Sequence, residues 1–163
     1  MKIFLDFDDC LFDTVLVRGT FWLDLRKIYE GGGWSVEMIE KTADEFSDAS
    51  FDGKPNTYSI EKHLALLHEK QPSERYEEVL RECQIFMREL GRYVFPDVAS
   101  FLKQFPKQDL FIVTFGDPGF QKGKIVGAHI DQYVHDILVS EGQSKLSLIR
   151  QYADEQNFPL AEH

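Results

Sequence analysis

The sequence predicts an α/β protein with a parallel sheet, in which a long all-helical segment follows the first strand. Three observations support this fold class. An apolar run of strand length, residues 2–7, stands at the start of the chain and leads into a cluster of aspartates. Residues 15–94 carry helical patterns throughout. From residue 95 onward, apolar runs alternate with helical patterns, as in sheets whose parallel strands are joined by helices.

The first elements can be placed from their apolar and capping residues. Residues 2–7, KIFLDF, predict a short buried strand, and Asp13 or Thr14 can cap the helix after it. The glycines at 31–33 are expected to form a loop, because no strand precedes them and no Lys-Ser/Thr pair follows, as a phosphate-binding loop requires. Ser35 can cap the next helix, whose apolar face carries Val36, Ile39, Ala43 and Phe46.

The clearest helical pattern runs from Ser73 to Leu90, with Gly91 as its stop signal. Its apolar side chains recur at helical spacing and form one stripe: Tyr76, Val79, Leu80, Cys83, Phe86, Met87 and Leu90. Such a stripe is typical of a helix that packs on a core. We therefore expect a structural role for it and no cofactor site.

The second half of the chain alternates between helices and strands. Pro96 suits the first turn of a helix, and residues 110–114 and 136–140 read as two buried strands bounded by turn residues. A helix through Ile125 joins these strands, and a last helix begins near Ser144-Lys145. Because ligands bind at the carboxyl ends of parallel strands, the residues that follow the strands are the candidates for function.

Four polar residues from distant parts of the sequence follow the predicted strands. Asp6 and Asp8 end the first strand, Thr114 ends the second, and Lys145 comes just after the third. Asp6 and Asp8 lie in the stretch DFDDCLFDT, which has four aspartates within eight residues. Two carboxylates about 4 Å apart repel by roughly 4 kcal/mol at an effective dielectric near 20, so a nearby cation is expected.

Composition narrows the classes of partner. The 163 residues carry a formal charge of −10, which argues against sequence-independent binding to nucleic acid or to an anionic membrane. Too few apolar residues precede Asp6 for a signal peptide, and no apolar run is long enough to span a membrane, so a cytoplasmic location is expected. Cys10 and Cys83 lack metal-type spacing and are expected to be unpaired thiols, while the oligomeric state stays open.

The order FLDFDDCLFDT, FIVTFG and DILVSEGQSK resembles the haloacid dehalogenase-like (HAD) hydrolases, most of which are Mg²⁺-dependent phosphatases. The resemblance implies a Rossmann-like core over residues 1–14 and 95–163, with a helical cap over 15–94. It implies hydrolysis of a small phosphorylated metabolite through an aspartyl-phosphate. Specificity would come from cap side chains such as Arg18, Arg26 or Lys54.

The same resemblance implies a role for each site residue. Asp6 would be the nucleophile and a magnesium ligand, and Asp8 would bind magnesium through its backbone carbonyl and transfer protons through its side chain. The transferring phosphoryl group would be held by Thr114, Phe115, Gly116 and Lys145. Lys122 and Lys124 are rivals of Lys145 for the role of the motif lysine.

The sequence departs from the pattern of these hydrolases in several places. Cys10 replaces the usual Thr or Val, Phe115 replaces Asn, and Leu146 replaces Pro. The strand that brings further acids to the metal site is missing after Lys145, so a non-catalytic binding module and a fragment with weak magnesium binding stay open as alternatives. In this chain the missing ligand would have to come from another acid, such as Asp9, Asp13 or Asp117.

Other polar residues have simpler expected roles. Asp9 and Asp13 are more typical of turn or cap positions than of catalysis. The spacing of the histidines fits no metal-ligand motif, so solvated or hydrogen-bonded imidazoles are expected at His63, His68, His129 and His135.

Overall fold

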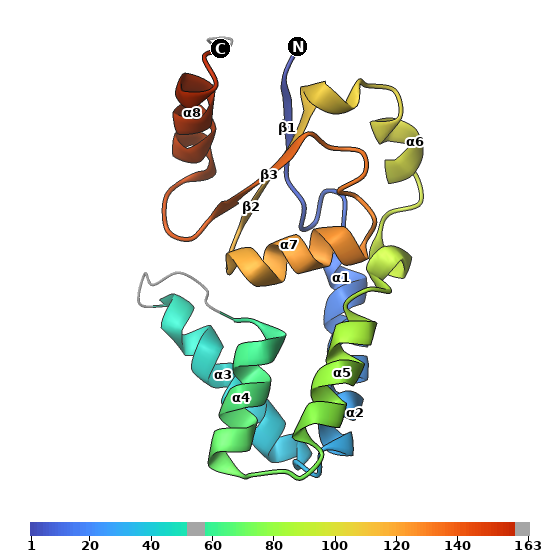
Figure 1. Ribbon diagram of the computed structural model, residues 1–163, viewed down its shortest axis with the longest axis vertical. Coiled ribbons are helices and arrows are strands. Elements are labelled where there is room, and N and C mark those ends of the chain that lie inside the picture. Colours follow the sequence, from blue (N-terminus) through green and yellow to red (C-terminus); the bar gives the residue numbers. More distant parts are fainter. Residues whose placement is uncertain (52–57, 159–163) are drawn as a thin grey trace.

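The structure is a computed structural model that describes residues 1–51 and 58–158. It is a mixed α/β molecule in which a parallel sheet and its helices form one half and a group of helices forms the other (Figure 1). Of the expected specificity residues, Lys54 lies outside the described residues, as does the side chain of Arg18. No helix in the described part of the chain is long and apolar enough to cross a membrane.

Three strands form the described sheet, in the order β1-β2-β3: Ile3–Leu5, Leu110–Phe115 and Asp136–Ser140. Both pairings are parallel, with Ile3 opposite Leu110 and Ile112 opposite Ile137. β2 is the central strand and is buried over its first five residues, which explains the unbroken apolar run from Leu110 to Val113. The predicted strands and their parallel arrangement are confirmed, and β1 is shorter than expected.

The described elements from the end of the turn after β1 to residue 93 are all helices, joined by short turns. Its elements are α1 (Thr14–Leu16), a π-helical turn η1 (Val17–Phe21), α2 (Trp22–Gly31), α3 (Val36–Phe51), α4 (Ile60–Lys70), α5 (Tyr76–Phe86) and a 3₁₀ turn η2 (Leu90–Tyr93). We call residues 15–94 the helical segment. Around the sheet lie α6 (Val98–Leu102), a 3₁₀ turn η3 (Lys107–Asp109), α7 (Pro118–Gly127) and α8 (Lys145–Glu155).

Two helix starts have the expected caps, and a third cap lies where the last helix was expected to begin. The Ser35 hydroxyl accepts the Met38 amide at 3.3 Å, and the Ser144 hydroxyl accepts the Ser147 amide at 3.1 Å. Asp13, one of two candidates for the first cap, accepts the Leu16 amide at 2.9 Å. These side chains satisfy amides that a helix leaves without partners in its first turn.

The predicted helix over residues 73–90 is wrong at both ends, since α5 covers only Tyr76–Phe86. At its start the Ser73 hydroxyl accepts the Arg75 amide at 3.2 Å and donates to the Gly32 carbonyl at 2.5 Å. Residues 73–75 thus form a turn docked on the glycine loop. Beyond the helix end, the chain runs so close to α7 that a Cβ on Gly127 would lie 1.8 Å from the Met87 carbonyl oxygen. Tertiary contacts therefore override the helical pattern.

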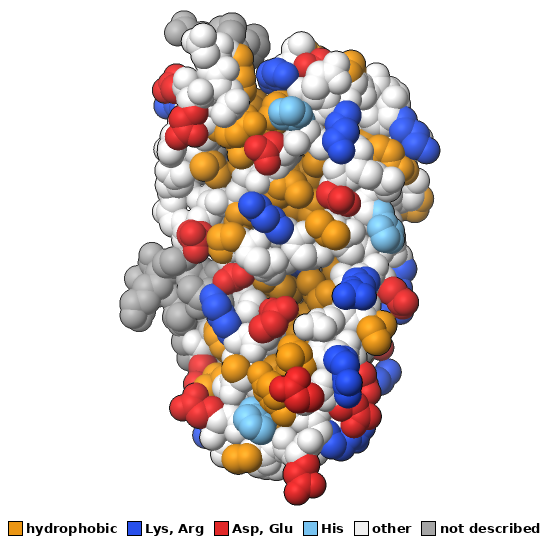
Figure 2. All heavy atoms as spheres, in the orientation of Figure 1, with side chains coloured by type: hydrophobic (Ala, Val, Ile, Leu, Met, Phe, Trp, Pro, Cys, Tyr) orange, Lys and Arg blue, Asp and Glu red, His pale blue; other side chains and the backbone are white. Residues whose placement is uncertain are grey.

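The core is one continuous cluster that extends from the sheet into the helical segment. Near the sheet it contains Leu110, Ile112 and Ile125, and Phe7 and Phe12 continue it toward the helices. The expected stripe of α5 packs on this core, with Val79 and Cys83 fully buried, so its structural role is confirmed. The other cysteine, Cys10, is exposed, and both thiols are unpaired as expected. On the face shown in Figure 2, acidic and basic side chains are interspersed.

His63 is the buried histidine of the helical segment. The Thr42 hydroxyl lies 2.8 Å from its Nε2 atom, the Tyr58 hydroxyl lies 3.4 Å from Nδ1, and the ring stacks on Trp22 with an interplanar angle of 7°. Burial lowers its pKa to about 4. The expectation of a hydrogen-bonded imidazole is confirmed here and at His68, whose Nδ1 atom accepts the Ser73 amide at 3.1 Å.

The neutral form of His63 should make the protein sensitive to acid. A pKa of about 4 in the folded state, against 6.5 when unfolded, means that folding excludes a proton. This contribution is complete above pH 6.5 and is lost as the pH falls toward 4, amounting to about 3 kcal/mol. Urea unfolding of wild type and His63→Gln at pH 7 and pH 4 tests this. The stability advantage of the wild type should shrink by about that amount on acidification, and a constant difference would contradict it.

Candidate active site at the carboxyl ends of the strands

A tight turn follows β1 and carries the two leading aspartates. The Phe7 carbonyl accepts the amides of Leu11 and Phe12 at 2.9 and 3.0 Å, and Asp9 donates its amide to the Phe12 carbonyl at 2.9 Å. Asp9 adopts a left-handed backbone conformation with φ of 59°, which aspartate tolerates better than most residues. The turn places Asp6 and Asp8 directly at the carboxyl end of β1. Asp9 itself is a turn residue, as expected.

Asp6 is paired with the lysine that begins α8. Its Oδ2 atom lies 2.6 Å from the Lys145 Nζ atom, and its Oδ1 atom accepts the Phe7 amide at 2.8 Å. Both side chains are open to solvent, with 44% of Asp6 and 38% of Lys145 exposed. Because an exposed pair is weakly held, Lys145 can move without a large loss of stability.

Asp8 is paired with a different lysine, Lys124 of α7. The Lys124 Nζ atom lies 2.5 Å from the Asp8 Oδ1 atom, and 8% of the lysine side chain is exposed against 29% of the aspartate. Burial lowers the pKa of Lys124, and the charges of Asp8 and Asp9 oppose this effect. Here the lysine is enclosed and the acid is the more accessible partner.

The loop after β2 contributes the second group of predicted residues. Thr114 is buried and lies opposite Val139, while the Phe115 side chain is exposed. Gly116 has φ of 135°, which favours glycine, and its amide donates to the Ser140 carbonyl at 3.0 Å. That amide therefore already has a partner in the neighbouring strand.

The three candidate lysines occupy different environments. Lys145 contacts Asp6, and Lys124 contacts Asp8. Lys122 is exposed and lines a groove of about 460 Å³ between α7 and the helices α4 and α5, with Gln84 and Arg88 on the opposite wall. Two of the three lysines therefore reach the turn that carries Asp6 and Asp8, which we call the acidic turn. The sequence pointed to all of them as alternatives for one role and did not indicate that two of them contact the aspartates at the end of β1.

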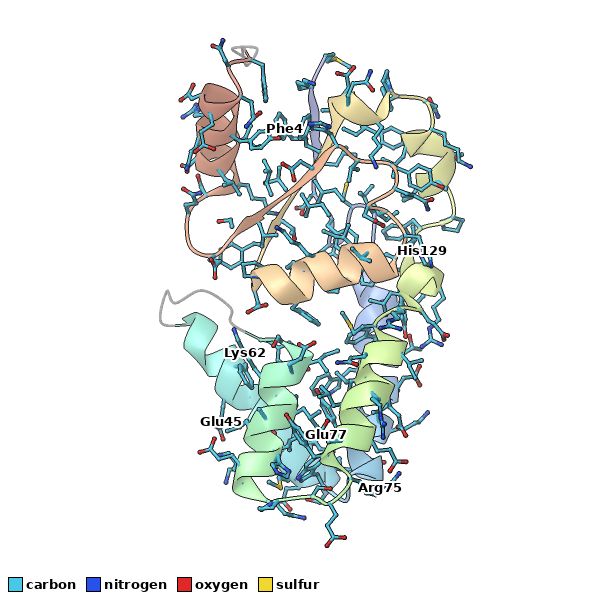
Figure 3. All side chains as sticks on the ribbon, viewed as in Figure 1. Phe4, Glu45, Lys62, Arg75, Glu77 and His129 are labelled. Atoms are coloured by element: carbon cyan, nitrogen blue, oxygen red, sulfur yellow. The ribbon has the colours of Figure 1, made fainter. Side chains whose placement is uncertain are left out.

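A contact joins the helical segment to the start of α7. The Lys62 Nζ atom of α4 lies 2.6 Å from the Asp117 Oδ2 atom, while Asp117 Oδ1 accepts the Phe120 amide at 2.9 Å and caps α7. Burial raises the pKa of Asp117, but Lys62 and the amides of Phe120 and Gly119 outweigh it, so the net change is a lowering. Figure 3 shows Lys62 at the end of α4 that faces α7.

The acidic turn can be tested for its fit to magnesium. In the described part of the chain, no three or more His, Cys, Asp or Glu side chains are grouped as metal ligands. Asp13 and Asp117, two of the acids proposed to complete a site, are occupied as helix caps. Asp6 and Asp8 nevertheless supply hard oxygen donors, and Mg²⁺ is commonly held by one or two carboxylates with water and substrate phosphate. The residues present fit such an ion.

Comparison with known proteins supports the fold. No protein-family model matches the sequence, and no curated protein sequence matches it. Among solved structures, the chain matches the candidate HAD-hydrolase YfnB from Bacillus subtilis with a TM-score of 0.53 and 20% sequence identity. The match covers 98% of this chain and 72% of YfnB, which is described as bound to magnesium and as showing interdomain movement. The resemblance predicted from the motifs is therefore confirmed at the level of the fold.

Proposed function

We propose that this chain is a HAD-like phosphohydrolase that hydrolyses a small phosphorylated metabolite through an aspartyl-phosphate. Its Rossmann-like core would comprise residues 1–14 and 95–163, and residues 15–94 would be its cap. The observation that carries the proposal is the unequal pairing of the two acids: Asp6 faces an exposed lysine and Asp8 faces a buried one. Such a difference in environment suits two carboxylates with different tasks.

Asp6 is suited to the role of nucleophile. Its Oδ1 atom is fixed by the Phe7 amide, so its Oδ2 atom, which faces Lys145, is the oxygen that would attack phosphorus. A phosphoryl group entering there would meet the Lys145 ammonium, which can shift from the carboxylate to the phosphoryl oxygens because it is exposed. The Thr114 hydroxyl at the neighbouring strand end would donate to the same group.

Asp8 would carry the proton in both half-reactions. In the first, a bond forms between Asp6 and phosphorus, the bond to the leaving oxygen breaks, and Asp8 gives its proton to that oxygen. In the second, a water attacks the aspartyl-phosphate while Asp8 takes its proton, which frees phosphate and restores the Asp6 carboxylate. The Asp8 carboxylate would take up a proton before the first half-reaction, and the second half-reaction returns that proton to it, so the two steps balance.

Magnesium would be held by the Asp6 carboxylate and the Asp8 backbone carbonyl. The ion would neutralise the charge of the phosphoryl group and of the attacking carboxylate. Because magnesium would contact only the backbone carbonyl of Asp8, it would leave the side chain, which Lys124 holds through Oδ1, to transfer the proton. YfnB, which shares the fold, is described as bound to magnesium, and this supports the choice of ion.

The helical segment would act as a cap over this site. Lys62 places α4 against the Asp117 cap of α7, three residues beyond Thr114, so a substrate bound at the strand ends would lie near α4. Interdomain movement is described for YfnB, and a comparable movement here would open and close the site. Arg26 is paired with Glu40 at 3.2 Å, away from the strand ends, which makes it a weaker candidate for specificity than it looked from sequence.

Turnover of p-nitrophenyl phosphate with Mg²⁺ and with excess EDTA tests the proposed function. We expect hydrolysis that depends on Mg²⁺ and is lost on chelation, because two carboxylates alone repel an anionic substrate. A panel of phosphorylated metabolites would then define the substrate. If no phosphomonoester is hydrolysed under any metal condition, the chain is better described as a non-catalytic binding module of this fold.

A further inference from the structure

Lys124 is a charged residue placed inside the core. Its ammonium lies 5.3 to 5.5 Å from the ring centroids of Phe7, Phe12 and Phe120, and the Asp8 carboxylate is its ionic partner. A buried ammonium is costly unless it is paired and well placed, although aromatic faces recover part of the loss. A methionine would fill the same volume without this cost. The burial of a charge here therefore calls for an explanation beyond packing.

The Lys124 ammonium also connects the loops after β1 and β2. It lies 3.3 Å from the Gln121 Oε1 atom, one turn earlier on α7. The Gln121 Nε2 atom in turn donates to the Phe115 carbonyl at 2.9 Å. A continuous path thus runs from the Phe115 carbonyl through Gln121 and Lys124 to the Asp8 carboxylate. We call these two side chains the Gln121–Lys124 bridge.

The bridge is more rigid than the other lysine contact of the site. Lys124 is confined by three rings and by its place on α7, whereas Lys145 is exposed and can follow a moving phosphoryl group. The loop after β2 is held against the bridge as well, because a Cβ on Gly116 would lie 3.0 Å from the Gln121 Nε2 atom. The bridge therefore fixes the Asp8 carboxylate relative to Thr114 and its neighbours.

We propose that Gln121 and Lys124 are positioning residues, which hold Asp8 where it can give its proton to the leaving oxygen of a substrate bound at Thr114. This inference rests on the proposed phosphohydrolase function. Lys124 acts through Asp8 and does not touch the substrate. The rate of proton transfer falls steeply when the donor is displaced. Loss of the bridge should therefore slow hydrolysis most for substrates whose leaving oxygen needs a proton.

Two substrates separate this role from general damage. p-Nitrophenyl phosphate has a leaving group that departs with little help, whereas an alkyl phosphate such as glycerol phosphate needs the proton. We expect Lys124→Met to lower kcat/KM for the alkyl phosphate roughly 10²-fold and for p-nitrophenyl phosphate by less than about 3-fold. Gln121→Met, which removes the contacts of Gln121 with Lys124 and Phe115 but keeps the pair of Lys124 and Asp8, should show a smaller loss of the same kind. Equal losses for both substrates would overturn the positioning role.

Two further variants complete the kinetic test. Lys122→Met removes an exposed lysine from the same helix and should leave both rates unchanged. The double variant Asp8→Asn with Lys124→Met should be no slower with the alkyl phosphate than Asp8→Asn alone, since a residue that acts through Asp8 has nothing to position once its carboxyl is gone. A double variant slower than both single ones would show that Lys124 acts on the substrate independently, contrary to the inference.

Thermal unfolding tests the bridge without reference to activity. Asp8→Asn leaves the buried ammonium unpaired and should lower Tm by roughly 10 °C, and adding Lys124→Met should recover most of that loss. Additive changes in Tm would mean that the pair does not exist in solution, which would overturn the inference. If the Tm changes of the variants are coupled but the wild type hydrolyses no phosphomonoester, the proposed function is refuted. The bridge is then a structural contact only.

Discussion

Asp6→Asn should reduce phosphomonoester turnover by roughly 10⁴-fold or more, because an amide cannot serve as the nucleophile. The substitution keeps the shape of the side chain and its acceptor for the Phe7 amide, so the fold should survive. It removes the charge that faces Lys145 and the oxygen that would form the covalent bond. Initial rates with p-nitrophenyl phosphate and Mg²⁺ measure the loss, and intact mass after rapid quenching shows whether a phosphoryl group is attached.

Asp13→Asn is the matched control for this substitution. Asp13 lies in the same acidic stretch but caps α1 through the Leu16 amide, and asparagine caps helices about as well as aspartate. Its activity should stay close to that of wild type. A covalent phosphoryl group on wild type that is missing from Asp6→Asn would identify the nucleophile. Turnover by Asp6→Asn within 10-fold of wild type would exclude Asp6 from that role.

Asp8→Asn should lower kcat roughly 10²- to 10⁴-fold while keeping magnesium bound. Magnesium should stay bound because its proposed ligand at this position is the backbone carbonyl of residue 8, which the substitution does not alter. Asp6→Asn should instead weaken magnesium, because it removes a carboxylate ligand. Calorimetric titration of both variants with MgCl₂ compares the two affinities, and equal weakening would contradict the division of roles.

The loss of the Lys124 partner complicates this comparison and can be controlled. Because Asp8→Asn leaves a buried ammonium unpaired, its rates have to be measured well below its own Tm. The double variant with Lys124→Met removes that charge and should bind magnesium with the affinity of Asp8→Asn. A large gain in affinity on adding Lys124→Met would show that the Lys124 charge, and not the ligand set, limits metal binding.

Much of the fold was predictable because it depends on local patterns. The strands at 110–114 and 136–140 are apolar runs between turn residues, and their burial follows directly from those runs. Ser35 and Ser144 cap their helices with side chains that act within a few residues. The exposed pair of Asp6 and Lys145 was within reach of the same reasoning, since parallel strands bring their carboxyl ends together.

The pair of Asp8 and Lys124 could not be derived in this way. Apart from the spacing of Lys124 from Gln121, nothing in the local sequence separates Lys124 from Lys122, and both look like solvated residues of a helix. Which of them turns inward depends on the rotation of α7 against the sheet, which is set by contacts such as the approach of Gly127 to Met87. The three-residue spacing of Gln121 and Lys124 places them on one face of α7, and was the only local signal available. The ends of α5 were mispredicted for a similar reason, because distant contacts of Ser73 decide where it begins.

The pairing of β1 with β2 has a consequence for how the chain assembles. Ile3 pairs with Leu110, so the whole helical segment has to be synthesised between the two partners. At typical rates of synthesis this takes roughly 5 to 20 s, and helices built from local contacts form much faster than that. The helical segment can therefore fold before β2 has been synthesised and can pair with β1.

The acidic turn would then be among the last features to take its final shape. Asp6 is fixed by the entry of β1 into the sheet, and Lys145 is made later still. Before β2 is synthesised, β1 is unpaired. Because β1 is only Ile3–Leu5, the apolar edge that the incomplete chain exposes is short. Formation of the Asp6–Lys145 pair would mark the end of folding, so a nascent chain would have no reactive site before its sheet is complete.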